Sequence, residues 1–122
     1  MAVTSIDSKA AGDRADTDVV ERPHAFWWFA ILGGLTILAF QGFSPDFYAY
    51  WTSHVNPLPG RAVMRGIFIG CVPIHVYEAV YVHRLAVRLG MHRSAVGWSV
   101  QTFFLGFPST YLIRRRAAKA VA

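Results

Sequence analysis

Charged side chains are scarce in this chain of 122 residues. Asp, Glu, Lys and Arg make up 16% of the sequence, whereas an ordinary soluble domain has about 25%. Two stretches, residues 23–45 and 94–113, contain none of these four residue types. Each is close to the roughly 20 apolar residues that cross the hydrocarbon core of a bilayer. The scarcity of charge therefore predicts an integral membrane protein surrounded by a lipid bilayer.

Cysteine is almost absent. Cys71 is the only one, which excludes an intramolecular disulfide and a multi-cysteine zinc site. Because Cys71 lies in an apolar run, we interpret it as a small packing residue rather than a redox centre. The motifs of phosphate-binding loops, dinucleotide sites, zinc proteases and serine hydrolases are also missing. We therefore predict no metal, no cofactor and no assigned catalytic residue.

Basic residues are in excess. Lys and Arg number 12 against 7 Asp and Glu, which gives a formal net charge of +5. No aromatic-basic RNA-binding pattern or helix-turn-helix spacing accompanies this charge, so nucleic acid is not an expected partner. Beside apolar runs, positive charge favours anionic lipid headgroups. Residues 1–22 hold five acids and few large apolar side chains, and we predict them to be a disordered acidic tail.

The predicted fold is all-α with three transmembrane helices. We expect them at about residues 23–43, 61–89 and 94–113, within a transmembrane domain at 23–113. Residues 114–122 then form a basic tail. Only a few residues separate the last two helices, so these two should form a tight antiparallel hairpin.

Capping and proline signals add detail to this fold. Ser44, Pro45 and Asp46 are typical of an N-cap, a first helical residue and an acid in the first turn. The aromatic residues that follow predict a short helix lying in the membrane interface after the first span; a lid over a lipid-binding cleft is the alternative. Ser94 can cap the third helix, and Pro73 predicts a kink in the second.

The orientation of three spans is nearly balanced. An odd number of spans places the two chain tails on opposite sides of the membrane. Six Lys and Arg residues then lie on each side, which is a tie under the positive-inside rule. The dense basic cluster at residues 114–119 favours a cytoplasmic C-terminus in this multi-pass protein.

A polar cluster is predicted inside the membrane. Glu78 is the only Asp, Glu, Lys or Arg in the apolar run 66–82, and an acid at this depth costs roughly 2.5–3.5 kcal/mol. His75 lies one helical turn earlier and can pair with it. Gln101, near the middle of the third helix, can close the pair across the hairpin, and Tyr81 is a further member.

Three interpretations of this cluster remain open. It can be a structural clasp between helices, a recognition site for a lipid or sterol, or an acid-base or metal site. Ala30 and Gly34 also give the first helix a small-xxx-small surface for helix packing. We predict a non-enzymatic accessory or partner subunit of a larger membrane assembly, or a homo-oligomer. The alternatives are a lipid- or sterol-binding protein and an isomerase-like enzyme that uses His75 and Glu78 as acid and base.

Two sequence motifs give the chain a family resemblance. Residues 74–81 read I-H-V-Y-E-A-V-Y, residues 101–107 read Q-T-F-F-L-G-F, and a basic tail follows. This order resembles the small transmembrane protein 254 family over roughly residues 66–119. The resemblance implies a three-helix integral membrane protein and indicates the same four polar residues, without naming an activity. The chain departs from the pattern in its long acidic tail and in Pro73 and Pro108. A weaker similarity is to emopamil-binding and related sterol-isomerase proteins, which have more spans.

Overall fold

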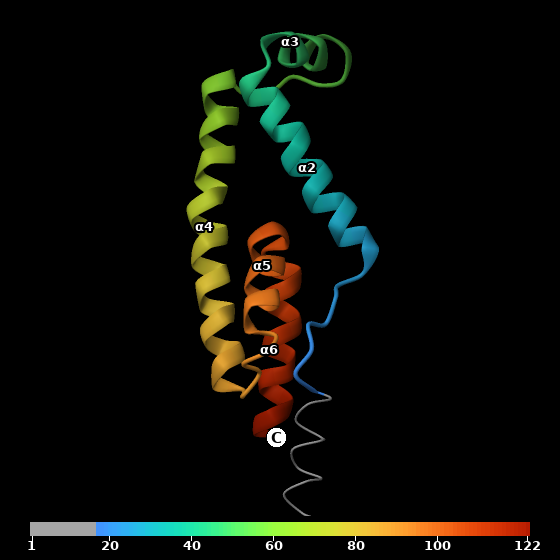
Figure 1. Cartoon of the computed structure of the whole chain (residues 1–122). Coiled ribbons are helices and arrows are strands. Elements are labelled where there is room, and N and C mark those ends of the chain that lie inside the picture. Colours follow the sequence, from blue (N-terminus) through green and yellow to red (C-terminus); the bar gives the residue numbers. More distant parts are fainter. Residues whose placement is uncertain (1–16) are drawn as a thin grey trace, which may run out of the picture.

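The computed structural model describes residues 17–122, and the regular structure in this range is helical throughout (Figure 1). This confirms the all-α prediction. The helices are α2 (Ala25–Phe43), α3 (Pro45–His54), α4 (Arg61–Arg88), α5 (Ala95–Leu105) and α6 (Phe107–Val121). Of the predicted acidic tail, residues 1–16 lie outside the described part of the chain.

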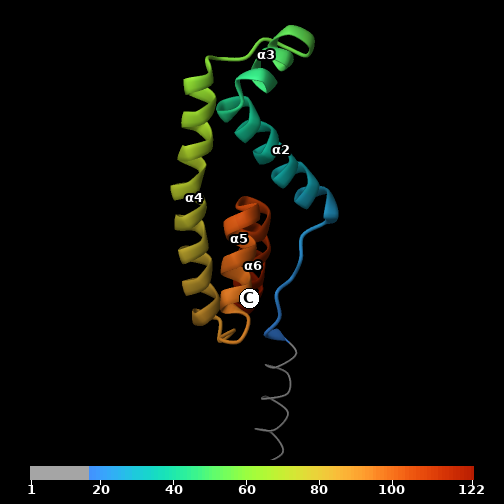
Figure 2. The ribbon, with the colours of Figure 1, turned by 45° about the horizontal axis from the view of Figure 1, so that its top comes forward.

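The long helix α4 runs along one side of the molecule. α2 lies beside α4 at the end that carries α3 and diverges from it toward its own N-terminus (Figures 1 and 2). α5 packs along the other half of α4, and α6 returns antiparallel to α5. The junction of α5 and α6 therefore points into the space between α2 and α4. Residue 17 and the C-terminus lie at the same end of the molecule, which we call the basal end; the opposite one is the α3 end.

Between residues 17 and 122, two helices, not three, are long and apolar enough to cross a membrane. These are α2, with 19 residues, and α4, with 28. The third predicted span is wrong because the chain breaks at Gly106, where φ is +63° and ψ is −125°. Glycine adopts this backbone region readily and other residues rarely do. The 11 residues of α5 extend only about 16 Å, roughly half of a hydrocarbon core of about 30 Å.

Local signals fix the start of α3 as predicted. The hydroxyl of Ser44 accepts a hydrogen bond from the backbone N–H of Phe47 at 3.3 Å, and Pro45 occupies the first turn. The position of α3 in a membrane interface remains a prediction. α4 continues through Pro73 as one assigned helix, and the kink expected at this residue remains a prediction.

The hydrophobic core lies at the basal end. It is built from α4, α5, α6 and the turn before α5, and Val20 from the N-terminal segment packs against it. Its buried members are Val82, Ala86, Met91, Ala95, Trp98 and Ile113.

α2 and α4 approach each other closely at the α3 end. Gln41 and Gly42 are the buried residues of α2. A Cβ atom added at Gly42 would lie 2.9 Å from Cγ of Arg65 and 3.0 Å from its backbone nitrogen. Only a residue without a side chain allows the two helices to approach this closely.

Candidate functional site

His75 on α4 binds the end of α5. Its Nδ1 lies 2.5 Å from the carbonyl oxygen of Phe103. Because a carbonyl oxygen can only accept, Nδ1 is the donor in this hydrogen bond. The last carbonyl groups of a helix lack partners within the helix, and the break at Gly106 leaves the Phe103 carbonyl in that position. His75 thus satisfies a backbone group that the broken helix would otherwise leave unpaired.

Glu78 lies against the same break. A Cβ atom added at Gly106 would be 3.0 Å from Oε2 of Glu78 and 3.3 Å from Nε2 of His75. The carboxylate therefore faces the start of α6, which carries the positive end of a helix dipole, while the imidazole faces the negative end of α5. Within residues 17–122, the side chain of Glu78 makes no hydrogen bond to His75 or to any other residue.

His75 and Glu78 line different cavities. Glu78 lies in a groove of about 630 Å³ between α4 and α6, which we call the α4–α6 groove. Its other lining residues are Phe107, Thr110, Tyr111, Arg114 and Arg115. His75 instead lines a smaller apolar cavity of about 130 Å³, together with Leu35 of α2, Phe103, Phe104 and residues of α4. No single space described in the structure presents both side chains to one ligand.

The other two predicted cluster residues lie elsewhere. Gln101 is buried, and its amide donates to the carbonyl oxygen of Glu21 and to the hydroxyl of Ser109, both at 3.0 Å. Thr102 donates to the same hydroxyl at 2.9 Å. The break at Gly106 folds α6 back and places Ser109, rather than His75 or Glu78, beside Gln101. Tyr81 is 41% exposed, and within the described range it makes no hydrogen bond.

An N-terminal segment, residues 17–22, caps α5; we call it the strap. The carboxylate of Asp18 accepts hydrogen bonds from the backbone N–H of Arg93 at 3.0 Å and of Ser94 at 2.9 Å. It also accepts from the hydroxyl of Ser94 at 2.6 Å. Ser94 occupies the N-cap position of α5, as predicted, but its side chain makes no capping hydrogen bond and its hydroxyl donates to Asp18 instead. The Ser94 hydroxyl, with the N–H groups of Arg93 and Ser94, lowers the pKa of the Asp18 carboxyl.

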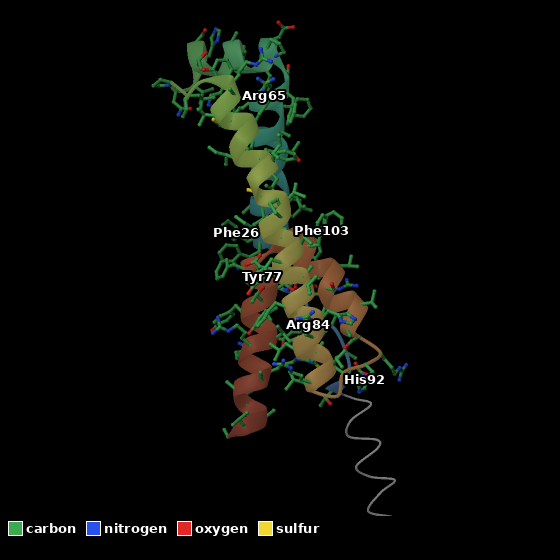
Figure 3. The ribbon with its side chains drawn as sticks, turned by 90° about the vertical axis from the view of Figure 1, so that its left-hand side faces the viewer. Phe26, Arg65, Tyr77, Arg84, His92 and Phe103 are labelled. Atoms are coloured by element: carbon green, nitrogen blue, oxygen red, sulfur yellow. The ribbon has the colours of Figure 1, made fainter. Side chains whose placement is uncertain are left out.

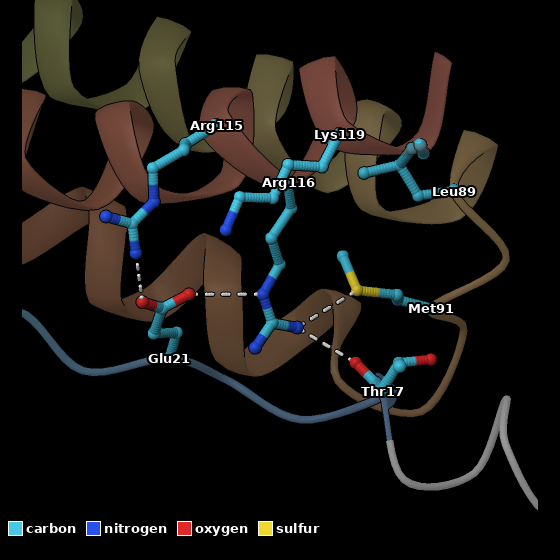
Figure 4. A pocket seen from close by; sticks show the side chains of 8 residues that line it. Thr17, Glu21, Leu89, Met91, Arg115, Arg116 and Lys119 are labelled. Atoms are coloured by element: carbon cyan, nitrogen blue, oxygen red, sulfur yellow. Dashed lines mark hydrogen bonds and ion pairs between the residues drawn. The ribbon is translucent and has the colours of Figure 1, made fainter. Parts of the chain in front are cut away.

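Arginines of α6 hold the strap at its other end. The carboxylate of Glu21 accepts from Arg115 at 2.8 Å and from Nε of Arg116 at 3.2 Å (Figure 4). Arg116 also donates to the carbonyl oxygens of Thr17 and Val19, at 2.9 and 3.0 Å. These contacts are made by residues 17–22 of the tail that the sequence predicts to be disordered. The acids of the strap pair with groups more than 70 residues away, which no local pattern reveals.

A basic cavity lies under the strap; we call it the basal pocket. It has a volume of about 510 Å³ and contains three cations and one carboxylate (Figure 4). Its lining residues are Thr17, Glu21, Leu89, Met91, Arg115, Arg116, Lys119 and Ala120. From the sequence, residues 114–119 are expected to belong to a basic tail, and no pocket is expected there. Arg115 and Lys119 are four apart, a spacing that places them on one face of a helix and could have indicated the pocket.

The described residues offer no candidate metal centre. Between residues 17 and 122, no three His, Cys, Asp or Glu side chains are grouped closely enough to hold an ion. The chemistry available at Gly106 is therefore that of one imidazole and one carboxylate against two helix ends.

Comparison with known proteins identifies the family. The family model described as Transmembrane protein 254 matches residues 26–115, which is most of the chain. The chain therefore belongs to the transmembrane protein 254 family, as the two motifs predicted. No curated protein and no solved structure matches it. The family description and the two long apolar helices together indicate a membrane protein.

Proposed function

We propose that this protein is a non-enzymatic accessory subunit that binds a helix of a larger membrane protein. The observation that carries this proposal is an unused glycine surface on the outside of α4. Gly66 and Gly70 are both exposed, and a Cβ atom added at either would meet nothing within 4 Å. Small residues four apart allow two membrane helices to pack closely, so this surface is available to a helix from outside the chain.

α2 offers a second surface of the same kind. Ala30 and Gly34 are exposed, and a Cβ added at Gly34 would also meet nothing within 4 Å. Neither small-residue surface is used for packing within the described part of the chain. Two unused surfaces on the two spanning helices support association with another membrane protein better than they support an isolated monomer.

The proposed topology has two spans and a re-entrant hairpin formed by α5 and α6. In this arrangement the basal end carries eight of the ten Lys and Arg residues described, and the α3 end carries Arg61 and Arg65. Figure 3 shows Arg65 toward one end of the molecule and Arg84 and His92 toward the other. The positive-inside rule then places the basal end in the cytoplasm. The tie found for three spans disappears because α6 returns to the side on which α5 begins. The eight basal residues are Arg22, Arg84, Arg88, Arg93, Arg114, Arg115, Arg116 and Lys119.

Cross-linking in native membranes tests the accessory role. The tagged full-length protein is cross-linked, purified in mild detergent and analysed by mass spectrometry for partners. Replacing Gly66 and Gly70 with Leu should lower the amount of cross-linked partner that is recovered at least ten-fold, because two bulky side chains would hold the helices apart. The control is Ile74→Leu, an apolar change at an exposed position of the same helix (59% exposed). Equal recovery of the partner in both variants would overturn the proposal, and a cross-linked product of twice the chain mass would indicate a homo-oligomer instead.

A second candidate function is lipid or sterol binding in the α4–α6 groove. It is favoured by Glu78, a half-buried acid without a hydrogen-bond partner among the described residues, at the wall of an otherwise largely aromatic and basic groove. Glu78→Gln should then change the lipids that copurify with the protein, whereas Gly66→Leu should not. Acid-base catalysis has less support, since His75 and Glu78 line separate cavities.

A further inference from the structure

The basal pocket combines cations with an apolar wall. Arg115, Arg116 and Lys119 supply three positive charges, against one carboxylate from Glu21. Leu89 and Met91, from the end of α4 and the turn after it, supply apolar surface to the same cavity. A ligand that fills this pocket should therefore carry negative charge at one side and hydrocarbon at the other.

The three cations have different roles. Arg116 is held by two strap carbonyl groups and by Glu21, and its guanidinium lies 5.4 Å from the centre of the Trp98 ring. It is therefore fixed by the fold. Among the described residues, the side chain of Arg115 bonds only to Glu21, through a pair that is 47% and 31% exposed. Lys119 makes no ion pair or hydrogen bond within the described range. Arg115 and Lys119 are the two cations that an incoming anion can engage.

Glu21 occupies the place of an anion in this pocket. Its carboxylate bridges Arg115 and Arg116, as a phosphate group would. Removal of the Glu21 charge would free Arg115 without releasing the backbone carbonyl of Glu21 that Gln101 binds. The strap is thus positioned as an internal competitor of a bound anion.

We propose that the basal pocket binds the anionic headgroup of a phospholipid. Arg115 and Lys119 bind the phosphate group, and the adjoining hydrocarbon packs against Leu89 and Met91. The pocket lies where α4 ends, at the level at which a spanning helix meets lipid headgroups. A free phosphate ion would make no use of the apolar wall. This site lies away from the glycine surfaces of α2 and α4. A test of lipid binding here can therefore fail or succeed without deciding whether the protein is an accessory subunit.

Binding of soluble lipid to the full-length protein tests the site. The protein is purified in an uncharged detergent and titrated with dihexanoyl phosphatidylglycerol, followed by native mass spectrometry at constant salt. Dihexanoyl phosphatidylcholine and inorganic phosphate are the comparison ligands. The acidic lipid should bind at least ten-fold more tightly than either, because only it offers both an uncompensated phosphate charge and hydrocarbon.

Single substitutions locate the binding. Arg115→Ala and Lys119→Ala should each weaken binding of the acidic lipid about five-fold. The matched control is Arg114→Ala, which removes a neighbouring arginine that lines the α4–α6 groove instead and should change the affinity less than two-fold. Glu21→Gln should strengthen binding several-fold by removing the competing carboxylate.

Three results would overturn the site. Equal weakening by Arg114→Ala and Arg115→Ala would show general attraction to positive charge. Inorganic phosphate binding as tightly as the acidic lipid would show a free-anion site. Weaker binding by Glu21→Gln would show that Glu21 does not compete. If Arg115→Ala lowers the melting temperature, the affinity of Lys119→Ala for the acidic lipid decides whether the pocket is the binding site. The Lys119 side chain makes no hydrogen bond or ion pair among the described residues, so its loss should not disturb the fold.

Discussion

The two ends of this molecule are built differently. At the basal end, α4, α5, α6 and the strap bury a shared core, and the acids Asp18 and Glu21 are both paired. At the α3 end, α2 and α4 approach closely at Gly42, and they diverge toward the N-terminus of α2. Apolar side chains elsewhere on α2 are largely exposed, with Phe29 at 80%. The basal end thus supplies its own packing, whereas the exposed side of α2 has no packing partner among the described residues.

The largest expected effect is the loss of Trp98. Its side chain is fully buried in the basal core, so Trp98→Ala should reduce the free energy of unfolding by about 3–5 kcal/mol. The control is Phe29→Ala on α2, which removes an exposed ring and should cost less than about 1 kcal/mol. Circular dichroism during denaturation in detergent measures both. Similar losses for the two variants would show that the ends do not differ in packing.

The next effect concerns the break between α5 and α6. Gly106→Ala forces a non-glycine residue into φ +63° and places Cβ 3.0 Å from Glu78, which should cost about 1–3 kcal/mol. Gly90→Ala is the control, because Gly90 has φ +76° but nothing within 4 Å of an added Cβ. It should show the backbone strain alone, about 1–2 kcal/mol. The additional loss at Gly106, and its recovery on adding Glu78→Ala, measure how closely Glu78 packs against the break.

The sequence predicted the helix ends that depend on neighbouring residues. Ser44 and Pro45 define the start of α3 through a local hydrogen bond and a fixed φ angle, and both are visible in the sequence. The apolar runs of α2 and α4 are likewise local. Both runs are visible in the sequence and predict the two long apolar helices.

Features that depend on distant parts of the chain were missed. A count of apolar residues over 94–113 cannot detect that Gly106 adopts a positive φ angle and reverses the chain. The same break places Gln101 beside Ser109, so the predicted cluster is divided. The strap belongs to the tail that the sequence predicts to be disordered. The partners of its acids, Ser94 and Arg115, are far away in sequence, so no local pattern reveals these contacts. Glycine followed by proline two residues later was the one local sign of the break.

The smallest effect expected is the pH dependence that Asp18 gives to the basal end. The pKa of its carboxyl is lowered from 3.8 in the folded protein, first by the Ser94 hydroxyl and then by backbone N–H groups. A lowered pKa means that the ionised carboxylate stabilises the fold. This contribution is present in full well above pH 3.8 and is lost as the pH falls below 3.8, through the folded pKa.

Hydrogen exchange at the start of α5 measures this contribution. Asp18→Asn should raise the exchange rate of the Ser94 amide at pH 6, and the difference from the unmodified protein should shrink toward pH 3. Asp46→Asn, at the α3 end, removes an acid that lies on another helix and should leave this amide unchanged. A difference that stays constant from pH 6 to pH 3 would mean that the charge of Asp18 does not hold the strap, and the basal end would lose one of the two paired acids that distinguish it.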